Sequence, residues 1–154
     1  MSEPHTRIAL PDERALAVLA ASAAAHLPRG TLLLLSGPLG AGKTTFVRHL
    51  ARALGCAADV TSPTYALVHE YPTPRGTLVH VDAYRLGDGA ALHALGLDEL
   101  RAEAYLTVVE WGEVLLGAGG VAAGLDAPLA HLELDRAGDA PAVHGATWRR
   151  LASP

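Results

Sequence analysis

Residues 32–45 read LLLLSGPLGAGKTT, an apolar run that leads directly into a glycine-rich loop. Gly37, Gly42, Lys43 and Thr44 occupy the four fixed positions of the pattern G-x-x-x-x-G-K-[ST], which is typical of a phosphate-binding loop. Its glycines let backbone amides approach phosphate oxygens without Cβ clashes. Lys43 can reach the β- and γ-phosphates as a mobile cation, and the Thr44 hydroxyl can ligate Mg²⁺. The stretch therefore predicts a site for a nucleotide triphosphate or a ligand of similar shape.

The residues on either side satisfy the structural context that this motif needs. Four consecutive leucines are typical of a strand buried in a parallel sheet. Residues 46–54 carry apolar side chains at helical spacing, and Gly55 follows as a natural C-terminal cap. The positive end of this helix adds to the attraction for an anion. The alternative is a chance glycine-rich turn, which would lack this agreement of strand, loop and helix.

Length and composition narrow the class of protein further. A chain of 154 residues is long enough for one domain with a buried core, and we treat residues 1–154 as a single domain. The longest apolar run is too short to cross a bilayer, and the first residues do not read as a secretory signal. A single cysteine, Cys56, leaves no internal disulfide and suits a reducing cytoplasm.

Charge and histidine spacing argue against two other classes of binding protein. The formal net charge is −4, and no basic stripe of the kind that grips nucleic acid is evident. The eight histidines include no i,i+4 pair and no ligand spacing with the cysteine, so a dedicated histidine metal site is not predicted.

The order of the other predicted elements indicates an α/β fold. A short edge strand at 8–10 and a helix at 11–26, capped by Asp12, precede the phosphate loop. After it we expect strands at 66–71 and 77–81, a helical region at 90–104 split by Gly96, a strand at 106–110, a short helical stretch near Glu113, a linker at 117–124, and an antiparallel hairpin of 129–134 and 141–148 around a turn at 135–140. This order predicts a P-loop NTPase-like, mostly parallel central sheet flanked by helices, with antiparallel additions.

Two carboxylates end predicted strands. Asp82 closes LVHVD and Glu110 closes LTVVE, where strands of an open α/β sheet deliver side chains to a ligand crevice. A phosphate loop needs such a carboxylate across the site to help hold Mg²⁺. Either residue alone could instead cap the turn that follows its strand.

Two further segments have nucleotide-site interpretations of different strength. Thr64 in Ser62-Pro63-Thr64 lies where nucleotide switches place a threonine that senses the γ-phosphate, although spacing alone leaves this interpretation even with a structural one. The D-x-x-G match at residues 135–138 lies far downstream, and no N-K-x-D motif exists, so GTP specificity is not supported.

Four segments in this order resemble one family: GPLGAGKTTFVRHLARALG, VTSPTYALVHEY, VHVDAYRL and VVEWGE. Together they are similar to the bacterial TsaE (YjeE) ATPases, over roughly residues 10–115. That resemblance implies ATP/ADP and Mg²⁺ as cofactors and a part in making threonylcarbamoyladenosine at position 37 of tRNA. It also implies TsaD and TsaB as partner proteins, with tRNA contact mainly through the partners. No membrane association is expected, because the apolar runs are short.

The resemblance further implies roles for individual residues. Thr44 and Glu110 would coordinate Mg²⁺, Asp82 would be catalytic or position water, and Lys43 and Thr64 would act on the phosphates. Trp111 would lie beside the metal-binding glutamate, and Glu13 near the adenine. The nucleotide would be cradled by Gly37, Pro38, Leu39, Gly40, Ala41, Gly42, Lys43, Thr44 and Thr45. In two departures from the family pattern, Pro38 removes one N–H donor from the loop, and His80 and Ala83 flank Asp82 in place of bulkier residues.

Three functions are compatible with these residues. The leading one is a slow, partner-dependent ATPase subunit of the tRNA-modifying machinery. A small-molecule kinase matches the size and the loop, but such kinases usually need a mobile, arginine-bearing lid, and the arginines after Tyr84 are scattered. A non-hydrolysing nucleotide switch that only controls partner binding is the third.

Overall fold

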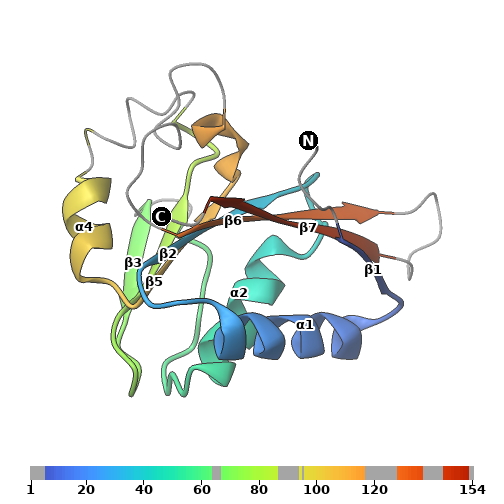
Figure 1. The fold of residues 1–154 in the computed structure, drawn as a ribbon, viewed down its shortest axis with the longest axis horizontal. Helices are drawn as coiled ribbons and strands as arrows, with labels where there is room; N and C mark the ends of the chain where they lie inside the picture. The colour runs from blue at the N-terminus through green and yellow to red at the C-terminus, as the bar shows by residue number, and fades with distance from the viewer. Residues whose placement is uncertain are drawn as a thin grey trace.

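The computed structural model describes residues 6–63, 67–86, 94, 96–116, 128–136 and 144–152. A seven-stranded sheet with the order β1-β7-β6-β2-β5-β4-β3 forms its centre (Figure 1). The strands are β1 (Thr6–Leu10), β2 (Thr31–Ser36), β3 (Val68–Tyr71), β4 (Leu78–Asp82), β5 (Leu106–Glu110), β6 (Leu129–Arg136) and β7 (His144–Ala152). The helices are α1 (Glu13–His26), α2 (Lys43–Ala53), α4 (Leu97–Glu103) and the 3₁₀ helix η1 (Gly112–Leu115).

The middle of the sheet is parallel and its edges are antiparallel. β2 pairs in parallel with β5 and β6, and β5 pairs in parallel with β4. β3 joins β4 antiparallel at one edge, while β7 and β1 extend the other edge antiparallel beyond β6. This arrangement confirms the predicted mostly parallel sheet with antiparallel additions. The parallel strands are joined by crossover connections, whereas a hairpin adds an antiparallel strand at an edge.

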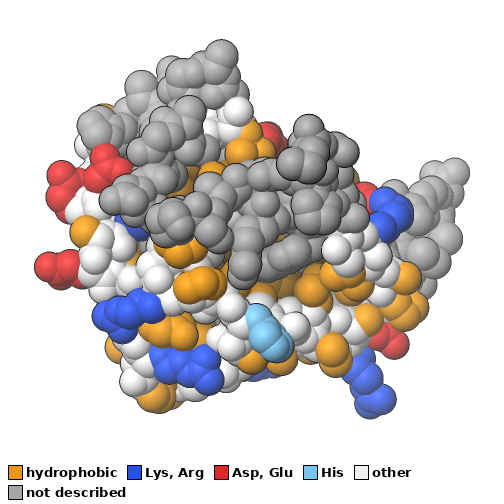
Figure 2. Space-filling view, viewed as in Figure 1, with side chains coloured by type: hydrophobic (Ala, Val, Ile, Leu, Met, Phe, Trp, Pro, Cys, Tyr) orange, Lys and Arg blue, Asp and Glu red, His pale blue; other side chains and the backbone are white. Residues whose placement is uncertain are grey.

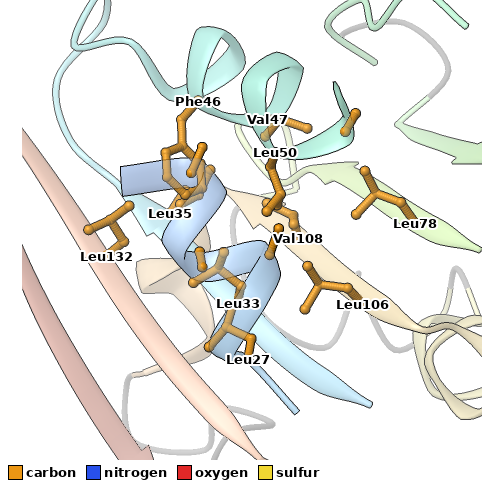
Figure 3. Close-up of a cluster of buried hydrophobic side chains, with 14 of the residues drawn as sticks. Leu27, Leu33, Leu35, Phe46, Val47, Leu50, Leu78, Leu106, Val108 and Leu132 are labelled. Atoms are coloured by element: carbon orange, nitrogen blue, oxygen red, sulfur yellow. The ribbon is translucent and has the colours of Figure 1, made fainter. Parts of the chain in front are cut away.

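Helices cover both faces of the sheet, and β2 is buried between them. Leu33 and Leu35 belong to the apolar cluster under α1 and α2, and Figure 3 shows them with Phe46 and Leu50 of α2. Leu32 and Leu34 alternate to the opposite face, where they join the cluster that includes residues of α4 and η1. A strand buried on both faces needs apolar residues at every position, which explains the run of leucines.

Helix α1 forms as its sequence predicts. Asp12 is its N-cap, since the Asp12 carboxylate accepts a hydrogen bond of 2.9 Å from the Ala15 amide. Leu16, Ala23 and Leu27 recur at helical spacing and are buried, so this side of the helix faces the core. Among the described residues, no helix combines the length and the apolar character needed to cross a membrane.

The later part of the chain differs in detail from the expectation. Asp135 lies in β6 and not in the hairpin turn, because β7 continues far enough to pair Gly145 with it. Within the expected helical region, α4 begins only after Gly96, whose positive φ of 79° separates it from the preceding residues. Residues 87–93 and 95, and the linker at 117–124, lie outside the described residues.

Candidate functional site

The glycine-rich loop connects the end of β2 to the start of α2. Gly42 is the N-cap of α2 with a φ of 103°, and none of the described side chains caps this helix end. The first-turn N–H groups are therefore left for a ligand, as in anion sites at helix N-termini. Gly37 must lack a side chain, because a Cβ atom there would collide with the carbonyl oxygen of Leu134 in β6.

A cavity of ≈ 360 Å³ lies beside this loop and joins most of the predicted site. It is lined by Leu39, Gly40, Gly42, Lys43, Thr44, Thr45, Ser62, Asp82, Tyr84, Glu110 and Trp111. A second cavity, of ≈ 200 Å³, shares Gly40, Gly42 and Thr45 with the first and reaches Glu13 and Ala41. The loop is thus bordered by two hollows, one with the carboxylates and one with the start of α1.

Lys43 is buried and points back toward its own loop. Its Nζ atom donates hydrogen bonds to the carbonyl oxygens of Gly37 (2.7 Å) and Pro38 (2.9 Å). The same atom lies 3.9 Å from the centre of the Trp111 ring, a cation–π contact. Burial lowers the pKa of Lys43 below its ordinary value, although the negative charges of Glu110, Glu113 and Asp82 partly offset this effect. A phosphate would give this desolvated cation an anionic partner in place of two neutral carbonyls.

Glu110 is buried at the end of β5 with both carboxylate oxygens engaged. Oε1 accepts a hydrogen bond of 2.7 Å from the Thr44 hydroxyl, and Oε2 lies 3.0 Å from His80 Nε2. Because the hydroxyl of Thr44 uses its proton toward Glu110, its oxygen lone pairs are available to a cation. This contact joins the second residue of α2 to a carboxylate at the end of a strand, 66 positions later in the chain.

Asp82 stands at the same level of the sheet as Glu110. The two residues are register partners in the parallel pair of β4 and β5. Asp82 is also buried, and its Oδ1 atom accepts a hydrogen bond of 2.9 Å from the amide of Tyr84. Both carboxylates therefore reach the same cavity, as their positions at strand ends predict.

The donor set of this cavity suits Mg²⁺. A hydroxyl and two carboxylates are hard oxygen ligands, and Mg²⁺ is commonly held by one or two carboxylates together with substrate phosphates and water. No group of three or more histidine, cysteine or acidic side chains is arranged to hold a metal within the part of the chain that the structure describes. The residues present thus fit a cation that arrives with a nucleotide better than one held by the protein alone.

The turn after β5 places Trp111 over Lys43. Trp111 has a φ of 59°, a left-handed conformation that is unusual for a bulky residue and often occurs at functional sites. Gly112 follows because a Cβ atom there would lie 2.7 Å from Cβ of Leu34. The Tyr84 ring packs on the indole with centroids 5.0 Å apart, so β4 and β5 together support the aromatic side of the cavity.

Sequence reasoning missed two residues of this site and left one untested. His80 was expected only as a neighbour of Asp82, yet it contacts Glu110; its position two residues before Asp82 places it on the same strand face but does not indicate this contact. Tyr84, which supports Trp111, had no signal beyond its position after the strand. Thr64 lies outside the described residues. Glu13 contacts His49 in α2 at 3.0 Å and borders the second cavity only.

Comparison with known proteins agrees with this geometry. The family model described as "Threonylcarbamoyl adenosine biosynthesis protein TsaE" matches residues 10–140. A "tRNA threonylcarbamoyladenosine biosynthesis protein TsaE" of Synechocystis is 38% identical over 124 residues, covering 75% of each chain. The protein of the same name from Streptomyces coelicolor is 47% identical over 90 residues, covering 56% of this chain and 60% of its own.

A solved structure extends the similarity to the fold. The crystal structure of Bacillus subtilis YdiB superposes with a TM-score of 0.74 at 26% sequence identity, covering 99% of this chain and 89% of that one. The phosphate loop, the paired strand-end carboxylates and these relatives lead to one assignment. The chain belongs to the TsaE family of tRNA threonylcarbamoyladenosine biosynthesis proteins, with a P-loop α/β fold.

Proposed function

We propose that this chain binds and hydrolyses ATP with Mg²⁺ and thereby drives threonylcarbamoyladenosine formation at position 37 of tRNA, together with TsaD and TsaB. The observation that carries the proposal is the 2.7 Å hydrogen bond from Thr44 to Glu110 beside the uncapped start of α2. It places a hydroxyl, a carboxylate and free backbone amides around one cavity. In P-loop enzymes this combination serves the phosphates and their metal ion.

Each residue of the cavity has a proposed part in the reaction. The loop amides and Lys43 bind the phosphates, while Thr44 and Glu110 would hold the metal ion, which when bound neutralises charge on the β- and γ-phosphates. Asp82 orients the attacking water or accepts its proton, because its carboxylate lines the cavity and, among the described residues, accepts one hydrogen bond, from an amide. We keep Thr64 as a residue that contacts the γ-phosphate. ADP would remain as the product nucleotide.

The rim of the cavity supports the proposed dependence on partners. Leu39, in the loop, is 82% exposed, and Tyr84, beside Asp82, is 64% exposed. Large exposed apolar side chains next to a site are typical of surfaces that partner proteins cover. We therefore place the docking of TsaD and TsaB at this face. A partner could also supply an arginine finger, a contribution of roughly 10³ to 10⁵ in rate in related enzymes.

Surface charge supports indirect contact with tRNA. Figure 2 shows acidic side chains gathered on the side where Figure 1 places α4, and basic side chains at separate positions. On the described part of this face, the basic side chains do not merge into one broad surface. Because this chain has a net charge of −4, we propose that the partners hold most of the tRNA.

We also propose that residues 1–154 act as a single P-loop domain in the cytoplasm.

Steady-state phosphate release tests this function. We expect slow release by the isolated chain, and a marked increase when TsaD, TsaB and tRNA are titrated in. A matched titration with Lys43→Ala controls for ATPase contamination from the partners. Fast release that partners do not change would contradict the proposal, and phosphate transfer to a small acceptor would favour the kinase alternative. Nucleotide-gated partner binding without hydrolysis would favour the switch.

A further inference from the structure

The strongest unexplained feature of the site is the contact between His80 and Glu110. His80 lies inside β4, it is completely buried, and its Nε2 atom is 3.0 Å from Oε2 of Glu110. We propose that His80 is a positioning residue that orients the Glu110 carboxylate for the metal ion brought by the nucleotide. The inference rests on the proposed function, because it assigns a role toward that metal site.

The geometry assigns the two oxygens of Glu110 to different tasks. Oε2 is directed into the sheet, toward His80, while Oε1 faces Thr44 at the start of α2. His80 is paired with Val108 across β4 and β5, so it reaches Glu110 diagonally from one strand level lower. A carboxylate held at one oxygen by an imidazole cannot rotate freely about its terminal torsion. The other oxygen, Oε1, therefore stays directed toward Thr44 and the position proposed for the cation.

The surroundings of the imidazole define which nitrogen carries the proton. His80 Nδ1 is buried and has no hydrogen-bond partner among the described residues. Glu110 offers only acceptor oxygens when ionised, so the proton belongs on Nε2, which donates to Oε2. The site thereby leaves one ring nitrogen unsatisfied, which costs folding free energy. A histidine that served only to fill the core could be replaced by leucine without that cost.

Outer partners of metal ligands commonly have large effects on metal binding, and this supplies the test. We would measure the affinity of a fluorescent, non-hydrolysable ATP analogue while free Mg²⁺ is varied, with EDTA as the metal-free baseline. For His80→Leu we expect a rise of about 10-fold in the Mg²⁺ concentration that gives half of the maximal increase in analogue affinity. This is the lower end of the usual range for such partners. Affinity in EDTA should stay close to that of the unmodified chain.

Two further variants separate positioning from packing. His80→Gln retains an N–H donor at similar reach, so it should restore the Mg²⁺ response to within about threefold. His131→Leu is the matched control, because His131 is another buried histidine that uses Nε2, here toward the Ser36 hydroxyl at 2.6 Å. His131→Leu should lower the urea midpoint of unfolding. It should leave unchanged the Mg²⁺ concentration that gives half of the maximal increase in analogue affinity.

The tautomer provides a measurement that needs no variant. ¹⁵N-labelled histidine in the unmodified chain should show His80 protonated at Nε2, whereas protonation at Nδ1 alone would overturn the proposal. This measurement and His80→Gln keep the test decisive even where His80→Leu does not fold.

The outcomes distinguish this inference from the proposed function. A Mg²⁺ response lost in Glu110→Ala but intact in His80→Leu would overturn the role of His80 and leave the metal site standing. A His80→Gln variant as defective as His80→Leu would also overturn it, because the donor would then not be what matters. If Mg²⁺ has no effect on the unmodified chain, the proposed metal site fails and this inference fails with it.

Discussion

The ends of β4 and β5 carry carboxylates at the same level of the sheet, but in different surroundings. Glu110 at the end of β5 has a partner on each oxygen, Thr44 on one side and His80 on the other. Asp82 at the end of β4 accepts one hydrogen bond among the described residues, from the backbone amide of Tyr84. Equal placement by the backbone therefore produces one tightly held carboxylate and one that is held at a single point.

This difference shows that strand register alone does not assign chemical roles. A metal ligand benefits from a fixed direction, whereas a group that positions water or takes a proton needs an oxygen directed at the open cavity. The three contacts that distinguish the two residues come from α2, from the interior of β4 and from the turn after β4. The side chains and amides around each strand end, rather than the strand register, thus separate the two carboxylates.

The largest effect is expected from removing the Lys43 ammonium, whose pKa both carboxylates influence. Lys43→Ala should weaken triphosphate binding by about 10²- to 10⁴-fold, because about two charge-assisted hydrogen bonds are lost. Lys43→Arg should not restore binding, since a planar guanidinium does not fit the space of a slim ammonium. Nucleotide titration of both variants gives the result. Affinity and turnover like those of the unmodified chain, in either variant, would refute the phosphate-site assignment.

Removing each carboxylate in turn tests the comparison directly. Asp82→Ala should reduce turnover about 10²-fold, as expected for loss of a general base, with little change in nucleotide affinity. Glu110→Ala should instead weaken Mg²⁺-dependent nucleotide binding by more than the about 10-fold expected for His80→Leu, because it removes a proposed ligand rather than the partner of that ligand. Binding and single-turnover hydrolysis, measured on the same preparations, separate the two effects. The reverse pattern would mean that the roles of Asp82 and Glu110 are exchanged, and equal mild effects would count against a two-carboxylate site.

The smallest expected effect concerns stability without nucleotide. Burial lowers the pKa of Lys43 from its ordinary value of 10.5, so the folded chain binds this proton less tightly than the unfolded chain. The charged side chain then opposes folding at neutral pH, and this cost is relieved as pH rises from the folded pKa toward 10.5. Lys43→Met should therefore slightly raise the urea midpoint at pH 7.5, with the gain shrinking at alkaline pH.

A lower urea midpoint for Lys43→Met than for the unmodified chain would contradict this expectation. It would mean that the two carbonyl contacts and the Trp111 ring stabilise the ammonium by more than its desolvation costs. Lys43→Leu, which has a similar apolar volume but a branched shape, controls for packing differences. Agreement between the Met and Leu variants would attribute the change to charge.

The sequence was sufficient for the fold and for the backbone positions of the site. Leucine at every position of residues 32–35 indicates a strand buried on both faces, and the GKT motif marks the start of the helix. LVHVD and LTVVE each end at a carboxylate, and in the structure the two carboxylates are register partners that line one cavity. These features are local, since they depend on spacing within one segment.

The side-chain contacts could not be predicted in the same way. The contact of His80 with Glu110 joins residues 30 positions apart, and it depends on the register of two strands, which local spacing does not reveal. In the sequence, His80 has the same appearance as a core histidine. The left-handed φ of Trp111 also has no signature in its residue type, because bulky residues rarely adopt it.

The position of β6 has a consequence for shortening this protein. The segment after residue 128 carries no motif that we assign to the nucleotide site, yet β6 lies between β7 and the fully buried β2. A chain ending before Leu129 would keep every phosphate-loop residue and both strand-end carboxylates, but it would expose one side of β2 as an unpaired edge. Flat, hydrophobic edges of this kind recruit other strands and promote aggregation. We therefore expect the least distinctive part of the chain to decide whether a minimal nucleotide-binding fragment remains in solution.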